Sequence, residues 1–541
     1  MPSESSRVRL ITWAWYLGTI LFCALLLSDS LNWNFGYDQG TFAYGGSAIL
    51  KGARPYLDFW DIKPPNVFYV YSLAFTLFGE SVRVIRIFDF WNALLTISLL
   101  WLVSMRLWKS EGVWWRRSAA MFASFAYVLC YLILGYQDTA QAEIYCLPLL
   151  LLSVLLVLYH NSEGAIDTWR LLLSGVAIGV TCFFKYPFGL FVLMPLAVIW
   201  VNHTKSISSF RQLLFLAGGL LIALAVQAAL LLPSGELQEL WKITRQATFG
   251  YRNNNFSGSF GPLTNIRTSL KMFNWLWLVL GIVGCVLLLF RSDPERRRRM
   301  ISSIGIPLLG VLIAFVIVQS QNKGYKYHYQ VMLPWAMVLI GGGMAEVTRT
   351  VAERAGNWRY IVLTGLGIAF SVATILVGNE TLPIAIFRPI FRSIGDYSSP
   401  PNGYIAGNEL AEYVFHNSAP SDHIFIFGFQ PYVYWITGRK PSNRFLNTIH
   451  FKPTYVAPEL KEELLRSFNK PADSLPKLFF VETGDHYTSQ GNSNDDSWTM
   501  LNKRYPEIVR TLNTCYWPAD TVSGNILAFR VKTIYERGGA H

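Results

Sequence analysis

The chain has 541 residues, and its 46 Lys and Arg against 34 Asp and Glu give a formal net charge of +12. Only 15% of the residues are charged, whereas 52% are hydrophobic and 15% are aromatic. An average soluble domain has about 25% charged residues, and disordered chains are poor in aromatic side chains, so both classes are excluded. The six Cys form no disulfide framework and no zinc or redox motif. The composition is that of a membrane protein.

Apolar runs of about 20 residues, the length of a helix that crosses the hydrocarbon of a bilayer, recur along the chain. They predict eleven spans, at about 10–28, 85–105, 118–135, 143–159, 170–184, 188–202, 212–232, 272–290, 301–319, 329–346 and 360–378. A shorter apolar segment, 64–78, begins with two prolines. We expect it to form a helix that lies along the membrane interface.

Lys and Arg gather in alternate connections between these spans, which is typical of cytoplasmic loops. The run Arg296–Arg299 is the strongest example. This pattern assigns the positive charge to membrane orientation rather than to nucleic acid, and it places the N-terminus in the cytoplasm. We therefore expect a multi-pass protein of the cell's inner (plasma) membrane with its C-terminal region outside the cytoplasm.

The composition changes to that of a soluble domain from about residue 379. An amphipathic helix near 408–417 is followed by strand-like runs at 423–429, 477–483 and 525–531. These elements predict a small extracytoplasmic α/β domain over 379–541, after a transmembrane domain over 1–378.

The first outer loop, 29–84, carries charges among many aromatic residues. Asp38 follows the first span, and Asp58, Asp61 and Lys63 come before the interfacial segment. A carboxylate held at a membrane boundary is partly desolvated and needs a partner or a function. The alternative for Asp58 and Asp61 is that they are ordinary solvated loop charges.

The next outer turn, GYQDTAQAE, contains Asp138 and ends at Glu143, which opens the fourth span. A carboxylate at this position is favourable for a helix N-terminus, so one reading of Glu143 is a helix cap. The other is a second functional carboxylate that faces the same outer cavity as Asp38.

Two further outer connections contain basic residues beside aromatic ones. Lys185 lies alone in the hairpin FFKYPFG, and QNKGYKYHYQ brings Lys323, Lys326, Tyr327 and His328 before the tenth span. Such groups suit a lipid phosphate, which accepts charge-assisted hydrogen bonds. The eight His have no metal-ligand spacing such as HExxH, and we predict no metal site.

Several of these motifs occur in one order on one side of the membrane. They are YDQG (37–40), ARPYLDFWDIKPP (53–65), QAE (141–143), the Lys hairpin and the Tyr-rich approach to a late span. In this combination the chain resembles the GT-C superfamily of membrane glycosyltransferases. Within it, the chain is similar to the family-39 proteins, which include protein O-mannosyltransferases and aminoarabinose lipid A transferases.

The resemblance implies a sugar donor carried on a polyprenyl phosphate and a transfer that inverts the anomeric carbon. Asp38 matches the loop carboxylate that acts as base, and Lys63 matches a Lys that contacts the donor phosphate. We add Glu143 as a second catalytic candidate. The remaining assignments are donor phosphate binding for Lys185, Lys326 and His328, and substrate binding for Tyr37, Tyr56, Asp58, Asp61, Asp138 and Tyr327.

The expected partners are the lipid-linked donor, membrane lipids, and a glycan, lipid or protein as acceptor, with no nucleic acid. No cofactor is required by this scheme. Relatives often have an acidic residue where this chain has Gln39, and some have one where it has Ile62. Both departures argue against a divalent metal at the first loop.

Two other classes of protein remain as alternatives. A lipid or glycan transporter is also polytopic, but transporters place charges near the bilayer midplane and often contain repeats, and no repeat is visible here. A non-catalytic scaffold for envelope assembly would tolerate the loss of Asp38. A polymerase or ligase with a lipid pyrophosphate donor is the nearest alternative among enzymes.

Overall fold

A computed structural model of the chain describes residues 4–159, 166–202, 206–245, 275–290, 294–321, 325–355, 405–451, 457–485 and 495–532. The chain divides into two compact units. The first, here called the helical unit, consists of Met1–Trp33, Arg86–Gln227 and Pro262–Pro400. The second, the mixed unit, consists of Asn34–Ile85, Ala228–Gly261 and Pro401–His541.

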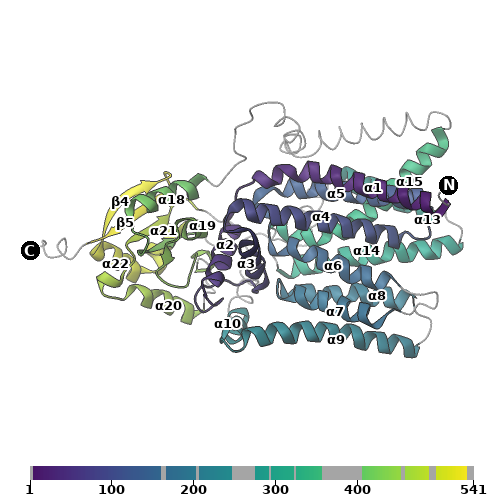
Figure 1. The fold of residues 1–541 in the computed structure, drawn as a ribbon. Helices are drawn as coiled ribbons and strands as arrows, with labels where there is room; N and C mark the ends of the chain where they lie inside the picture. The colour runs from purple at the N-terminus through teal and green to yellow at the C-terminus, as the bar shows by residue number, and fades with distance from the viewer. Residues whose placement is uncertain are drawn as a thin grey trace, which may run out of the picture. The chain divides into compact units, whose positions relative to one another are not determined.

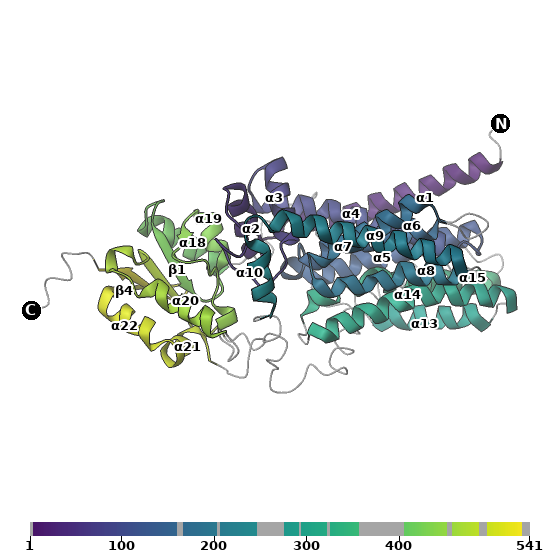
Figure 2. The same ribbon diagram turned by 90° about the horizontal axis from the view of Figure 1, so that it is seen from below.

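The helical unit is built from long apolar helices that run alongside one another (Figure 1, Figure 2). They are α1 (Glu4–Leu27), α4 (Val82–Leu107), α5 (Val113–Asp138), α6 (Ala142–Leu158), α7 (Thr168–Cys182), α8 (Leu193–Asn202), α9 (Ser206–Leu231), α13 (Trp275–Phe290), α14 (Pro294–Gln321) and α15 (Leu333–Ala355). Short 3-10 turns, η1 (Ser28–Asn32), η2 (Tyr186–Val192) and η4 (Lys326–Met332), lead out of or into them.

Six helices in the described ranges are long and apolar enough to cross a membrane. They are Ser6–Asn32, Val82–Leu107, Val113–Asp138, Phe210–Leu231, Met300–Gln321 and Lys326–Arg354. Shorter apolar helices, Ala142–Leu158, Thr168–Cys182, Tyr186–Val201 and Gly281–Phe290, coincide with four more predicted spans. The prediction of a mainly helical chain with several candidate membrane spans is confirmed. The eleventh span, 360–378, lies outside the described residues, so the count of eleven and the sidedness stay predictions.

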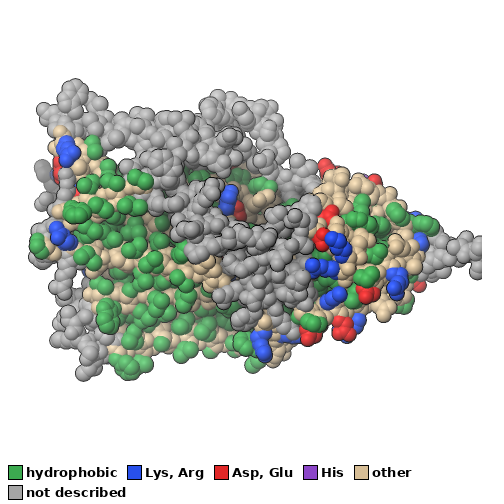
Figure 3. Space-filling model, turned by 180° about the vertical axis from the view of Figure 1, so that it is seen from behind, with side chains coloured by type: hydrophobic (Ala, Val, Ile, Leu, Met, Phe, Trp, Pro, Cys, Tyr) green, Lys and Arg blue, Asp and Glu red, His purple; other side chains and the backbone are tan. Residues whose placement is uncertain are grey.

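The outer surface of this unit suits lipid. In the left part of Figure 3, green hydrophobic side chains are spread over the described helices, with few charged side chains among them. On α9, for example, Leu214, Leu221 and Leu230 are exposed. Small residues bring neighbouring helices together, as is common in membranes. A Cβ added at Gly175 of α7 or Gly219 of α9 would overlap the backbone of the other helix.

The mixed unit contains a five-stranded sheet with strand order β2-β1-β3-β5-β4. Its strands are β1 (His423–Phe427), β2 (Lys440–Pro441), β3 (Leu478–Glu482), β4 (Tyr516–Val522) and β5 (Ile526–Val531). β1 is parallel to β2 and to β3, with Ile424 opposite Leu478, and β5 is antiparallel to β3 and β4. The same unit contains the helices α18 (Ile405–Asn417), α19 (Pro431–Thr437), α20 (Pro458–Phe468), α21 (Ser497–Arg504) and α22 (Pro506–Cys515).

The three predicted strands and the amphipathic helix are confirmed as β1, β3, β5 and α18. β4 was not expected. Most of it is exposed and it contains Pro518, so it lacks the apolar alternation by which a half-buried strand is recognised. The proposed boundary at residue 379 lies outside the described residues.

The first loop folds into the mixed unit as α2 (Tyr37–Leu50) and α3 (Asn66–Phe78), and α10 (Glu236–Ile243) lies in the same unit. α2 packs against α19, where a Cβ at Gly40 would lie 2.8 Å from the backbone nitrogen of Tyr432. The helix expected at 64–78 is confirmed as α3, which ends at Gly79 with φ +84°. Its position along a membrane interface stays a prediction.

Candidate active site

Asp38 and Lys63 form an ion pair in the mixed unit. Asp38 lies in the first turn of α2, and the side chain of Gln39 holds the start of this helix by accepting a hydrogen bond of 3.0 Å from the backbone N–H of Gly36. Lys63 Nζ lies 3.2 Å from Asp38 Oδ1, and the two side chains are only 15% and 18% exposed. The structure therefore brings together Asp38 and Lys63, two of the residues that the sequence motifs singled out in the first loop.

The backbone of Lys63 is held on both sides. Its N–H donates to Asp61 Oδ1 at 2.8 Å, and its C=O accepts from the hydroxyl of Tyr56, also at 2.8 Å. Its ammonium group lies 4.7 Å from the centre of the Phe42 ring. Burial raises the pKa of the Asp61 carboxyl above its ordinary value, and the nearby Lys63 opposes this shift.

The other candidates from this loop have separate partners. Asp58 pairs with Arg54 at 3.1 Å, and the hydrogen bond from the Arg54 side chain holds the pKa of Asp58 below its ordinary value. Tyr56 is fully buried. The ring of Tyr37 stacks on Phe429 with the ring centres 5.1 Å apart.

A second polar cluster lies in the helical unit, around Glu143 in the first turn of α6. Glu143 is 1% exposed, and its Oε1 accepts a hydrogen bond from Lys185 Nζ. Lys185 also donates to Gln321 Oε1 at 2.8 Å, and His328 Nε2 lies 3.9 Å from Glu143 Oε1. The cluster draws on α6, the segment between α7 and η2, the end of α14, and η4.

Glu143 keeps one oxygen without a hydrogen bond. Its Oε2 is buried and has no partner in the part of the chain that the structure describes. Within the same ranges the N-cap side chain, Gln141, makes no capping hydrogen bond to α6. An unpaired acceptor beside a Lys and a His is suited to a ligand hydroxyl, because a buried polar atom without a partner is unfavourable.

Aromatic rings border this cluster. Tyr327 stacks on Tyr325 with ring centres 5.4 Å apart and meets His328 edge-on at 4.5 Å. Lys185 Nζ lies 5.5 Å from the centre of the Tyr327 ring. Lys326 is exposed, whereas Lys323 lies outside the described residues. The structure thus brings Glu143, Lys185, Tyr327 and His328 together.

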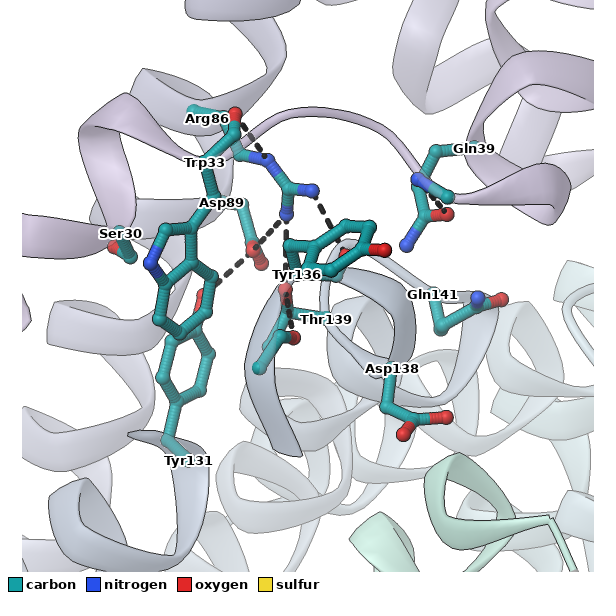
Figure 4. Close-up of polar contacts among 12 residues, drawn as sticks. Ser30, Trp33, Gln39, Arg86, Asp89, Tyr131, Tyr136, Asp138, Thr139 and Gln141 are labelled. Atoms are coloured by element: carbon teal, nitrogen blue, oxygen red, sulfur yellow. Dashed lines mark hydrogen bonds and ion pairs between the residues drawn. The ribbon is translucent and has the colours of Figure 1, made fainter. Parts of the chain in front are cut away.

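Sequence reasoning missed a buried group that holds the turn before Glu143. Arg86, 1% exposed, donates to the Thr139 hydroxyl and to the Tyr136 carbonyl, both at 2.9 Å (Figure 4). Its neighbour Asp89 accepts a hydrogen bond of 2.6 Å from Tyr131. The available signal was a charged pair three residues apart in an apolar helix, since such residues are rare in membrane spans.

This turn has an unusual backbone. Gly135, inside α5, has φ +70°, and Ala140 has φ +53°. The guanidinium group of Arg86 reaches this turn in Figure 4, while the carboxylate of Asp138 points away from it. The backbone C=O of Asp138 accepts from Gln330. The contacts of Arg86 and Gln330 therefore set the geometry of the connection that leads to Glu143.

Among the described residues, no group of three or more His, Cys, Asp or Glu side chains could hold a metal ion. The Asp38–Lys63 pair and the Glu143–Lys185–His328 cluster combine carboxylates with cationic or titratable groups, which suits proton transfer and anion binding.

Comparison with known proteins shows which sequences and folds this chain resembles. Residues 62–232 match the family model described as dolichyl-phosphate-mannose-protein mannosyltransferase. That segment contains Lys63, Glu143 and Lys185. No curated protein matches the chain in sequence. The resemblance to GT-C glycosyltransferases drawn from the sequence motifs is confirmed by this match and by the structures that follow.

Three solved structures illustrate the shared fold. ArnT from Cupriavidus metallidurans bound to undecaprenyl phosphate is 13% identical, with 97% of this chain and 98% of that chain covered and a TM-score of 0.51. The oligosaccharyltransferase AglB of Archaeoglobus fulgidus, in complex with an inhibitory peptide and a dolichol-phosphate, is 11% identical, with 96% and 74% covered and a TM-score of 0.50. The mycobacterial arabinofuranosyltransferase AftD is 14% identical, with 96% and 42% covered and a TM-score of 0.50.

Proposed function

We propose that the chain is a glycosyltransferase that moves a sugar from a polyprenyl-phosphate-linked donor to an acceptor hydroxyl at the outer face of the membrane, with inversion. The observation that carries this proposal is the largely buried Asp38–Lys63 pair in a chain that matches a mannosyltransferase family model over 62–232. The undecaprenyl phosphate and the dolichol-phosphate in two structures of the same fold support the donor class.

Asp38 is the proposed base. It takes the proton of the acceptor hydroxyl while the acceptor oxygen bonds to the anomeric carbon on the face opposite the phosphate. The bond between the anomeric carbon and the phosphate oxygen breaks, and the lipid phosphate leaves with the electron pair. General-base help of this kind contributes about 10²- to 10⁴-fold to a rate.

Lys63 is the proposed partner of the departing phosphate. A fixed cation near an oxygen that gains negative charge stabilises the transition state more than the ground state. Lys63 Nζ lies 3.2 Å from Asp38 Oδ1. A donor phosphate would compete for this cation, and the Asp38 carboxylate would then be released to accept a proton.

The Glu143–Lys185–His328 cluster is proposed to serve the same reaction. Glu143 Oε2, which has no partner within the described ranges, suits a hydroxyl of the acceptor or of the sugar, whereas Lys185 and His328 suit a phosphate. Tyr327, whose ring lies near Lys185, presents an aromatic face of the kind that packs against a sugar or a lipid chain.

A transfer assay tests the function. Purified protein in lipid vesicles would receive a polyprenyl phosphate carrying a labelled sugar together with extracts that contain candidate acceptors. We expect the label to leave the lipid and appear in an acceptor, and mass spectrometry of envelope glycans from cells with and without the gene to show the same unit. Label that crosses the bilayer while still attached to the lipid would instead indicate a transporter.

A further inference from the structure

We propose that Arg444, in the C-terminal part of the chain, is a positioning residue for the Lys63–Asp38 pair and that it acts through Tyr56. All four residues belong to the mixed unit. The catalytic consequence rests on the function proposed for Lys63. The geometric consequence, a displaced Lys63 ammonium group, does not.

Tyr56 has a backbone that its surroundings must hold. Its φ is +70°, in the left-handed region that is unfavourable for bulky residues, and its side chain is fully buried. Such a conformation persists only where neighbouring contacts over-determine it. The backbone N–H of Tyr56 donates to the carbonyl of Phe59 at 2.7 Å, and its C=O accepts a hydrogen bond from Arg444 Nη1.

Arg444 is itself rigidly oriented. Two of its nitrogens bind the carboxylate of Glu463 at 2.6 and 2.7 Å, and Nη1 also lies 2.8 Å from Glu239 Oε1. Its side chain is 13% exposed. Its backbone C=O accepts from the N–H of Trp60 at 2.8 Å. Arg444 therefore holds the segment from Tyr56 to Trp60 by two hydrogen bonds, one from its side chain and one to its backbone carbonyl.

The hydroxyl of Tyr56 links this fixed segment to the backbone of Lys63. It donates to the Lys63 carbonyl at 2.8 Å, while Asp61 accepts from the Lys63 N–H at 2.8 Å. With both backbone groups fixed, the Lys63 side chain reaches Asp38 at 3.2 Å. Without Arg444, the Tyr56 carbonyl loses a hydrogen bond. We expect the Tyr56 backbone then to relax towards an extended conformation, which moves its hydroxyl and removes a donor from the Lys63 carbonyl.

Chemical labelling of Lys63 tests the geometry without any activity. The full-length protein in vesicles is treated with an amine-reactive reagent, and mass spectrometry follows the labelling rate of Lys63 relative to that of the exposed Lys470. Because loss of a partly buried ion pair exposes the amine, we expect Arg444→Ala to raise this ratio about fivefold. An unchanged ratio would overturn the proposal.

Two further variants make the result specific. Arg439→Ala removes another buried Arg of the same segment, which donates to the carbonyls of Thr437 and Ser418 at 2.8 Å, and it should leave the Lys63 ratio unchanged. Tyr56→Phe keeps the buried ring and removes only the hydroxyl, so it should raise the ratio even if Arg444→Ala fails to fold. A ratio that rises equally in Arg439→Ala would reduce Arg444 to general support of the fold.

The transfer assay then separates the two proposals. Displacement of a catalytic group by about 1 Å can reduce a rate on the order of 10²-fold, so Arg444→Ala should lower kcat at least tenfold. In a protein that already carries Lys63→Ala, the same change should reduce kcat no further, because both act through one group. Faster labelling with normal transfer would sustain the positioning role and refute the proposed function. Normal labelling with lost transfer would refute the positioning role of Arg444 and would leave the proposed function standing.

Discussion

Lys185 and Glu143 lie 42 residues apart in the chain, and the structure joins them in a buried ion pair. Neither charge is favourable alone in such surroundings, since removing one partner of a buried pair typically costs about 3–5 kcal/mol. The pair holds the carboxylate at the start of α6, and one oxygen of this carboxylate has no hydrogen-bond partner among the residues that the structure describes. This arrangement makes Glu143 the first residue to test.

Glu143→Gln should impair transfer if the carboxylate positions an acceptor or a base. A helix cap alone would contribute about 1 kcal/mol or less to stability and would leave activity intact. The measurements are kcat for transfer and the thermal unfolding temperature of the purified variant. Glu346→Gln is a matched control, because Glu346 is also buried in a helix of the same unit, where it pairs with Arg349 at 2.6 Å. A fully active Glu143→Gln protein would reduce this residue to a structural one.

Asp38→Asn should lower transfer by about 10²-fold or more, because it keeps the size of the side chain and removes the proton acceptor. Folding should persist. The labelled-sugar assay on purified protein measures the loss, and the same substitution at the exposed Asp520 of β4 serves as its control. An active Asp38→Asn protein would exclude the mechanism in which this carboxylate is the base.

Lys63→Ala should weaken binding of a polyprenyl phosphate sugar and slow transfer, because the anionic leaving group loses its cation. The donor KM and direct binding of the lipid phosphate to protein in nanodiscs are the measurements. Lys51→Ala is the control, since Lys51 lies in the same unit with its side chain 69% exposed. Unchanged binding of the lipid phosphate in Lys63→Ala would contradict the role assigned to this residue.

The raised pKa of Asp61 predicts that the stability of the protein depends on pH. Burial raises the pKa of this carboxyl above its ordinary value of 3.8, so the folded state binds a proton that the unfolded state has already lost. The contribution of Asp61 to stability therefore falls as pH rises from about 3.8 through the folded pKa. Asp61→Asn, which keeps an acceptor for the Lys63 N–H, should exceed the wild type in thermal stability at neutral pH, with the difference shrinking towards pH 4. A difference that does not vary with pH would contradict this assignment.

The membrane topology is tested with reporter fusions. A reporter fused after residue 300 should report the cytoplasm, because Arg296–Arg299 favours that side. A reporter fused after residue 400 should report the outside. A cytoplasmic signal from the second fusion would place the sheet-containing domain, and the chemistry proposed for the outer face, on the wrong side of the membrane.

Much of the fold was predictable because it depends on local pattern. Apolar runs predicted helices such as α4, α5 and α14, and the strands β1 and β3 were predicted because each is a short apolar run. β4 was missed because its pairing with β5, not its own composition, makes it a strand. The helix α6 coincides with the predicted span 143–159, but its 17 residues are fewer than the roughly 20 that a helix needs to cross the hydrocarbon.

The sequence by itself determined the apolar helices, their order along the chain and the motifs that contain Asp38, Lys63 and Glu143, because hydrophobicity and motif spacing are local properties of the chain. Only the tertiary structure decided which side chains contact one another. The contacts between Lys185 and Glu143 and between Arg444 and Tyr56 join residues that are distant in sequence. Such pairs form where packing brings desolvated charges and unpaired backbone groups together, and no local pattern encodes which residue will meet which.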